Sequence, residues 1–140
     1  MTSLAAQNQR IVERYFDEVW NQGKVDVLDE LLAPDYVNHS SSLADSPPGP
    51  AGVKPIVIAM RRAFPDLRYR IDQLVVSEEA VAARVTLSGT HQGDFFGIAP
   101  TGKRFEVTQT NIERFRSGKI VEHFRNTDEL SLLRQLGVVP

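Results

Sequence analysis

The sequence predicts an α+β fold, in which helices pack on one face of a curved, mainly antiparallel sheet. Two observations lead to this prediction. Apolar residues follow helical spacing up to residue 64, and from residue 67 the spacing changes to the alternation of β-strands. A short helical pattern then closes the chain. Segregated helices and strands of this kind are typical of α+β proteins.

Composition limits the classes of protein that the chain can form. Its 140 residues, 41% hydrophobic and 24% charged, fit a single globular domain spanning residues 1–140. A net charge of −2 without a basic run argues against nucleic acid and anionic membranes as partners. The absence of cysteine excludes disulfides, thiolate nucleophiles and cysteine-bound zinc. No membrane-spanning run or secretory signal is visible, so we expect a cytoplasmic protein.

The first helix is expected from Leu4 to Trp20, capped by Thr2 or Ser3 and ended by Gly23. Its apolar positions recur at i, i+1, i+4 and i+5, which is the pattern of an amphipathic helix. They are Ile11, Val12, Tyr15, Phe16, Val19 and Trp20.

Two more helices are expected before residue 65. A short one covers Val25–Leu32, and a longer one covers about Ala51–Phe64, with Pro55 tolerated in its first turn. Between them, Asp35–His39 reads as a short extended piece, and the Ser- and Pro-rich segment 40–50 reads as a loop. This loop either covers a pocket mouth or is a plain surface connection.

Four strands are expected after the helices. Residues 67–77 and 80–91 alternate, with Tyr69, Ile71, Gln73 and Val75 on one face of the first strand. Residues 89–102 hold four glycines and a proline, which is typical of a bent crossover. The chain then returns through a hairpin around Ser117-Gly118-Lys119, and Thr127 or Asp128 caps a last helix that Gly137 terminates.

The hairpin from Arg104 to Asp128 carries the residues of chemical interest. On its first strand Phe105, Val107, Gln109, Asn111 and Glu113 share a face, and on its second Val121, His123 and Arg125 do. If the two polar faces coincide, amides, an imidazole and a guanidinium converge among apolar neighbours, as in a ligand pocket. The alternative is that these side chains lie on the solvent-exposed face of an antiparallel sheet.

Nearly the whole chain resembles the SnoaL-like polyketide cyclase family, in the superfamily that includes ketosteroid isomerase and nuclear-transport-factor-2-like domains. Six segments carry this resemblance. They are Tyr15–His39, Pro48–Gly52, Ala63–Arg68, Gly89–Lys103, Gly118–His123 and Leu132–Gly137.

The resemblance implies an α+β cone, a barrel-like, strongly curved sheet wrapped by helices around one deep apolar cavity. It also implies a homodimer or higher oligomer, and ring closure by intramolecular aldol condensation without metal or organic cofactor. In the characterised cyclases a pocket aspartate transfers the proton, beside a histidine two residues earlier and an amide on the neighbouring strand. These positions fall on Arg125, His123 and Gln109, with Asn111 as a neighbouring polar position.

Arg125 is the departure from the family pattern. Arginine stays protonated in proteins and cannot perform acid–base work near neutral pH, but a fixed cation can stabilise an enolate. His123 is then the first candidate for proton transfer, and its alternative is a structural histidine paired with Glu113. Asp128 is a second candidate, although capping the last helix is its more frequent role.

The remaining candidates are expected to bind substrate. His39 and His91 could reach the pocket from loops, and an aromatic group could hold a flat ligand. This group consists of Trp20, Tyr36, Phe64, Phe95 and Phe96. No H-x-H or H-E-x-x-H spacing supports a metal site, and no P-loop, Rossmann or G-x-S-x-G motif is present.

Two functions from different classes follow. The first is a cofactor-independent enzyme acting on a hydrophobic, carbonyl-bearing small molecule, by aldol cyclisation or by related isomerisation, dehydration or epoxide opening. The second is a non-catalytic small-molecule-binding or association module. Replacing His123 with Gln should abolish turnover in the first case and leave ligand affinity intact in the second.

Overall fold

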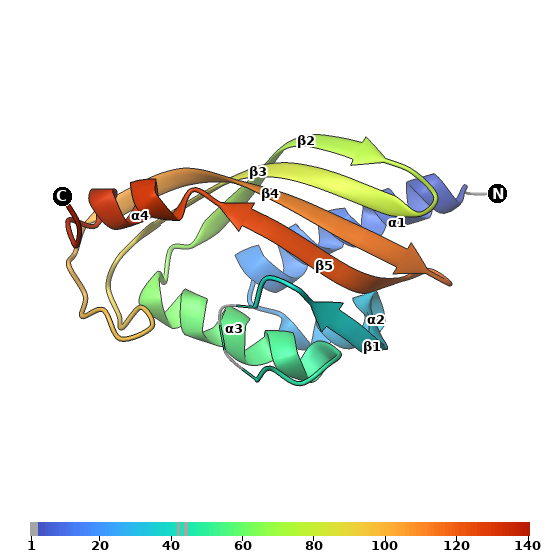
Figure 1. Cartoon of the computed structure of the whole chain (residues 1–140), viewed down its shortest axis with the longest axis horizontal. Helices are drawn as coiled ribbons and strands as arrows, with labels where there is room; N and C mark the ends of the chain where they lie inside the picture. The colour runs from blue at the N-terminus through green and yellow to red at the C-terminus, as the bar shows by residue number, and fades with distance from the viewer. Residues whose placement is uncertain (1–2, 42, 44) are drawn as a thin grey trace.

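The computed structural model describes residues 3–41, 43 and 45–140. Its elements are labelled in Figure 1 and follow in chain order. They are α1 (Leu4–Arg14), the π-helix η1 (Tyr15–Asn21), the 3₁₀ helix η2 (Val25–Val27), α2 (Leu28–Leu31), β1 (Leu32–Asn38), α3 (Pro50–Ala63), β2 (Arg68–Val76), β3 (Ala80–Thr90), β4 (Arg104–Arg116), β5 (Lys119–Thr127) and α4 (Glu129–Gln135).

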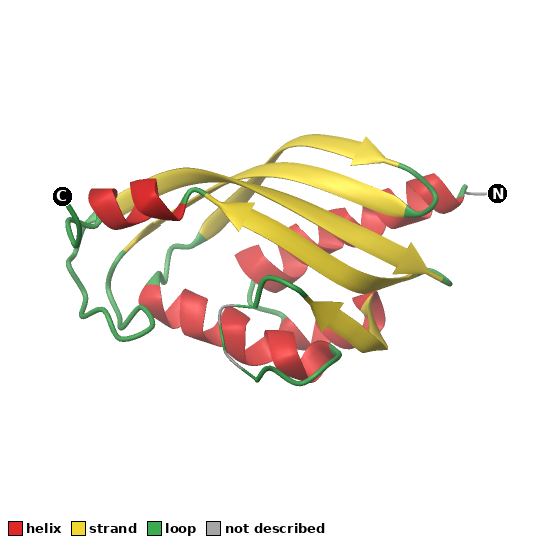
Figure 2. Cartoon of the chain, viewed as in Figure 1, coloured by secondary structure: helices red, strands yellow, loops and turns green. Residues whose placement is uncertain are grey.

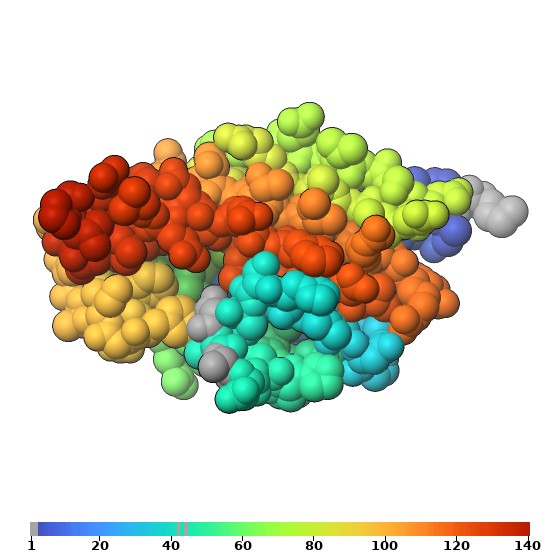
Figure 3. Space-filling view, viewed as in Figure 1, coloured from blue at the N-terminus to red at the C-terminus, as the bar shows by residue number. Residues whose placement is uncertain are grey.

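The strands form one curved sheet in the order β1-β5-β4-β3-β2, and Figure 2 shows α1 and α3 on the same side of it. The predicted α+β class is therefore confirmed. The sheet is open, with β1 and β2 as its two edges. Figure 3 shows residues of the 91–103 crossover and of α4 packed side by side at one end of the molecule. In the part of the chain that the structure describes, no helix is long and apolar enough to cross a membrane.

The N-terminal helices differ from the prediction in two ways. The first helix changes from α to π geometry at Tyr15, and its cap is Ser3, whose hydroxyl accepts from the Ala6 amide; Thr2 lies outside the described residues. The predicted second helix ends at Leu31, because Leu32 already begins β1. This strand lies parallel to β5, a long-range pairing that the expected extended piece at 35–39 did not reveal.

A bulge in β2 reverses one predicted face. The register shifts between Ile71 and Gln73, so Leu74 and Val76 pack on the core while Gln73 and Val75 face solvent. The prediction that Gln73 and Val75 share the face of Tyr69 was therefore wrong. One extra residue in a strand exchanges its two faces from that point onward.

A second bulge lies in β5. Phe115 pairs with Ile120, and the register then shifts so that Glu113 pairs with His123. Ile120 rather than Val121 is the fully buried residue at this end of the strand. The predicted grouping of Val121 with His123 and Arg125 fails for Val121 alone.

Candidate functional site

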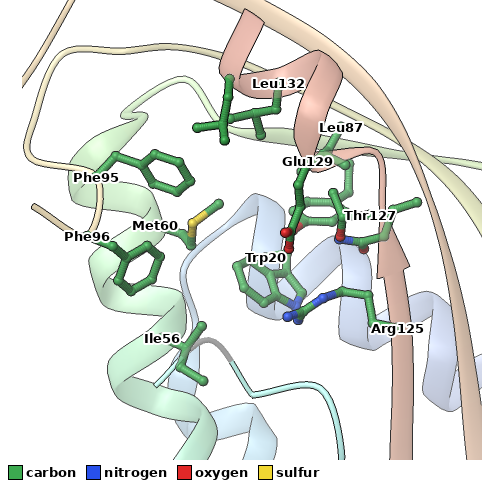
Figure 4. Close-up of a pocket in the computed structure, with 13 residues that line it drawn as sticks. Trp20, Ile56, Met60, Leu87, Phe95, Phe96, Arg125, Thr127, Glu129 and Leu132 are labelled. Atoms are coloured by element: carbon green, nitrogen blue, oxygen red, sulfur yellow. The ribbon is translucent and has the colours of Figure 1, made fainter. Parts of the chain in front are cut away.

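A cavity of about 300 Å³ lies between the concave face of the sheet and the helices. Figure 4 shows its lining side chains, which come from η1, α3, the crossover, the sheet and α4. Most are apolar or aromatic, and the polar groups are few, as in sites that bind hydrophobic small molecules. The lining residues are Trp20, Ile56, Met60, Tyr69, Leu87, Phe95, Phe96, Gln109, Arg125, Thr127, Glu129, Leu132 and Leu133.

Three cross-strand pairs build a polar ladder on the inner face of β4 and β5. Gln109 pairs with Thr127, Asn111 with Arg125, and Glu113 with His123. The two strands therefore do turn their polar faces to the same side. Alternation along each strand puts these pairs on one face, and the antiparallel register places each pair side by side.

Amide hydrogen bonds connect the end of the ladder that holds Gln109, Thr127 and Asn111. The Gln109 amide donates to the Thr127 hydroxyl at 2.8 Å, and the Asn111 amide donates to the Gln109 carbonyl oxygen at 3.0 Å. Gln109 and Thr127 line the cavity, whereas Asn111 is buried and does not. The hydrogen bond from Asn111 thus fixes the orientation of the Gln109 amide, which forms part of the cavity wall.

Glu113 and His123 form a buried pair at the lower end of the ladder. Their side chains are each 1% exposed, and His123 Nδ1 lies 2.5 Å from Glu113 Oε1. Burial raises the pKa of Glu113, because the loss of solvation outweighs the attraction to His123 and Arg125. His123 Nε2 is buried and has no hydrogen-bond partner among the described residues, and His123 does not line the cavity.

Arg125 brings a permanent positive charge to the cavity wall. Its guanidinium donates to the Ser40 carbonyl oxygen at 2.6 Å, which ties the end of β5 to the segment after β1. Figure 4 shows the guanidinium directed toward the Trp20 indole. Burial raises the pKa of Tyr69 to about 12, and the positive charge of Arg125 opposes this shift. The Tyr69 hydroxyl therefore stays protonated near neutral pH.

The five predicted aromatic residues separate into two groups. Trp20, Phe95 and Phe96 line the cavity. Phe64 is fully buried behind them, with its ring 5.2 Å from that of Phe95, and Tyr36 is buried away from this cavity. Phe96 has a φ of 44°, a left-handed conformation that non-glycine residues seldom adopt.

The other two histidines do not reach the cavity. His39 stacks on the ring of Phe124 at 4.6 Å, and its Nε2 lies 3.7 Å from Glu122 on the outer side of the sheet. His91 is fully buried in the crossover, where its Nδ1 accepts from the Thr101 amide at 3.1 Å. The proposal that either residue contacts substrate finds no support in this placement.

Asp128 and Glu129 are neighbours with different roles. The Asp128 carboxylate accepts from the Ser131 amide at 3.3 Å and so caps α4. Thr127, the other predicted cap, is the last residue of β5. Glu129 is the first residue of α4 and lines the cavity. Sequence reasoning missed Glu129, although its spacing to Leu132 and Leu133 puts all three on one helix face. Among the described residues, no cluster of three potential metal ligands occurs.

The structure defines an α+β cone with a mostly apolar cavity, and sequence comparison identifies its family. Residues 10–136 match the family described as SnoaL-like polyketide cyclase, so the chain belongs to that family.

Relatives and solved structures agree with this assignment. The aklanonic acid methyl ester cyclase AcmA of Streptomyces galilaeus is 32% identical, over 98% of this chain and 92% of its own. The nogalonic acid methyl ester cyclase of Streptomyces nogalater is 32% identical, over 84% of this chain and 89% of its own. TsrD from Streptomyces laurentii superposes with a TM-score of 0.87 at 30% identity, covering 96% of this chain and 97% of TsrD. IdmH from Streptomyces antibioticus superposes with a TM-score of 0.79 at 35% identity, covering 94% of this chain and 99% of IdmH.

Proposed function

We propose that this protein closes a ring in a polyketide-like substrate by an intramolecular aldol reaction. One observation carries the proposal: a guanidinium, that of Arg125, borders an otherwise mostly apolar cavity of about 300 Å³. An apolar enclosure strengthens the attraction between a cation and a developing oxyanion. Two relatives are, by their names, cyclases of aklanonic acid methyl ester and of nogalonic acid methyl ester, and they support the choice of substrate class.

The reaction needs no oxidant or reductant. A base takes a proton from a carbon next to a carbonyl group, and the enolate carbon then attacks a second carbonyl carbon of the same molecule. The new C–C bond forms as that carbonyl π bond breaks, and the resulting alkoxide takes up a proton. The product is therefore an isomer of the substrate.

The cavity residues suit these steps. Arg125 would hold the enolate oxygen, while the Gln109 amide and Thr127 hydroxyl would orient the substrate. Trp20, Phe95 and Phe96 offer aromatic surface for a flat ring system. The Glu113–His123 pair lies below Arg125 in the ladder, and proton transfer by His123 stays a prediction without a contact to the cavity.

The experiment presents purified protein with aklanonic acid methyl ester and nogalonic acid methyl ester, and follows products by chromatography with mass detection. We expect a product of unchanged mass and altered retention. Arg125→Gln should lower kcat by about 10²- to 10³-fold, the range seen when an oxyanion-stabilising group is lost. Arg114→Gln is the matched control, since Arg114 is exposed on the outer face of β4.

The outcomes separate the two functions considered. Binding of either ester without turnover would favour a non-catalytic binding module. Turnover that survives Arg125→Gln unchanged would contradict the role given to Arg125.

We also propose that the protein forms a homodimer through the outer face of its sheet. A row of side chains crosses this face on paired positions of four strands, and three of its members are large, apolar and exposed. The row consists of Val75, Ala82, Ile112 and Phe124. The expected cytoplasmic location stays a prediction.

A further inference from the structure

The aldol reaction proposed above needs a base, and the Arg125 guanidinium on the cavity wall cannot supply one. Four of the residues that line the cavity carry either a charged group or an aromatic ring with a polar hydrogen: Tyr69, Arg125, Glu129 and Trp20. Arg125 stays protonated, Tyr69 has its pKa raised to about 12, and the Trp20 indole is a donor only. Among the residues that line the cavity, Glu129 alone carries a carboxylate, the kind of group that serves as a general base.

The local structure of α4 directs Glu129 into the cavity. Leu132 and Leu133 line the same cavity, and they follow Glu129 by three and four residues. Side chains at these spacings lie on one face of a helix. Figure 4 shows the Glu129 carboxylate turned toward the space between Trp20 and Thr127, on the side where Arg125 lies. The cap at Asp128 fixes where this helix begins.

The carboxylate of Glu129 is available to a substrate. It makes no hydrogen bond or ion pair with any residue that the structure describes, whereas Asp128 caps the helix and Glu113 is bound to His123. It is also exposed, so a substrate entering the cavity would displace water from it. Removing water from a carboxylate makes it a stronger base.

We propose that Glu129 is the catalytic base of this protein, a role that rests on the function proposed above. Its carboxylate takes the proton from the carbon next to the substrate carbonyl, while Arg125 holds the enolate oxygen that forms. After the C–C bond closes, the protonated Glu129 returns its proton to the new alkoxide. The carboxylate ends each cycle as it began.

The test compares Glu129→Gln and Glu129→Ala with Glu122→Gln, a change of the same kind on the outer side of the sheet. Each variant is assayed with the two methyl esters, and Glu129→Ala is assayed again with added formate. We expect both Glu129 variants to lose at least about 10²-fold in kcat, with KM within about threefold, since a general base contributes about 10²- to 10⁴-fold. Formate should restore part of the activity of Glu129→Ala, because it fits the space left by the carboxylate. Glu122→Gln should keep wild-type activity.

Two results would overturn the assignment of Glu129 while leaving the cyclase function intact. One is wild-type kcat in Glu129→Gln. The other is a loss in Glu129→Ala that formate does not relieve and that appears mainly in KM, which would make Glu129 a substrate-positioning residue.

A second measurement keeps the test decisive if neither ester is turned over. Exchange of the carbon-bound protons of 2-tetralone, a flat aromatic ketone, is followed by proton NMR in D2O. Acceleration by the wild-type protein that disappears in Glu129→Gln would support the base, even though the proposed substrates had failed. No acceleration of exchange by the wild-type protein, together with no turnover of the esters, would overturn both proposals.

Discussion

At the scale of single residues, the Glu113–His123 pair is the most unusual feature of the molecule. Both side chains are almost completely buried on the same inner face that carries Arg125. Desolvation raises the pKa of Glu113, although the interactions with His123 and Arg125 act to lower it. For a buried ion pair, the free energy lost by removing the charges from water offsets much of the attraction between them. We therefore interpret the pair as a contact that holds β4 and β5 in register beneath the cavity.

The raised pKa of Glu113 predicts a pH-dependent stability. The folded state binds this proton more tightly than the unfolded state, whose Glu pKa is near 4.5. The contribution of Glu113 to the free energy of unfolding is therefore complete below pH 4.5 and is lost as the pH rises through the folded pKa. Each unit of separation between the two pKa values corresponds to about 1.4 kcal/mol.

Urea unfolding of the wild type and of Glu113→Gln between pH 4 and 8 measures this effect. The free energy of the wild type minus that of the variant should fall as the pH rises, because the amide has no proton to lose. Glu13→Gln, the same change at an exposed glutamate of α1, should leave the wild-type profile unchanged. A pH-independent difference between wild type and Glu113→Gln would show that folding does not shift the pKa of Glu113.

At the scale of elements, the 91–103 crossover forms the aromatic wall of the cavity by docking on the end of α3. The amides of Gln92 and Gly93 both donate to the Ala63 carbonyl oxygen, at 3.0 and 3.1 Å. Close approach requires a glycine here, since a Cβ at Gly93 would lie 2.3 Å from the Arg62 carbonyl oxygen. Phe95 and Phe96 follow two and three residues after Gly93.

Gly93→Ala is expected to lower the free energy of unfolding by about 1–3 kcal/mol, because a backbone carbonyl cannot move aside cheaply. Urea unfolding followed by the fluorescence of Trp20, the single tryptophan, measures the change. Gln92→Ala is the control in the same loop, with an exposed side chain and an unchanged backbone amide. Equal stability of the two variants would mean that the loop shifts away from α3 without cost.

The first helix shows how a sequence pattern can conceal a change of geometry. Its apolar pairs repeat every four residues, which is wider than the 3.6 residues of an α-helix turn. From Tyr15 to Asn21 the chain forms a π-helix, whose wider turn fits this four-residue repeat. The π-helix buries Tyr15, Phe16, Val19 and Trp20 together. Wider turns of this kind are frequent at functional sites, and here the element carries Trp20 to the cavity.

At the scale of the whole molecule, the two faces of the sheet carry different kinds of side chains. The concave face carries the ladder and the cavity. The convex face carries the row Val75, Ala82, Ile112 and Phe124, in which Ile112 is 43% exposed and Phe124 is 37% exposed. An apolar row on neighbouring strands is typical of a face that a second copy covers.

Ile112→Glu tests this interface. Sedimentation or light scattering should give twice the chain mass for the wild type and the single chain mass for the variant, because a charge would be buried without a partner. Leu130→Glu, on the exposed side of α4, should leave the mass unchanged. A monomeric wild type at 100 µM would refute the dimer.

The sequence by itself determined the class of fold, the hairpin, a cap at Thr127 or Asp128 and the common face of Gln109, Asn111 and Glu113. Each of these depends on spacing within one segment, and spacing is a local property that the chain carries before it folds. Even the departure at Arg125 could be seen there.

Only the tertiary structure decided which side chains share the cavity. The bulges at residues 72 and 121 depend on how neighbouring strands pair, so they turned Val75 outward and buried Ile120. His39 was carried to the outer side because β1 joins the edge of the sheet, which no local spacing reveals. Glu129 lines the same cavity as Arg125 because α4 packs back against β4. Such contacts join residues from separate elements, and only packing brings them together.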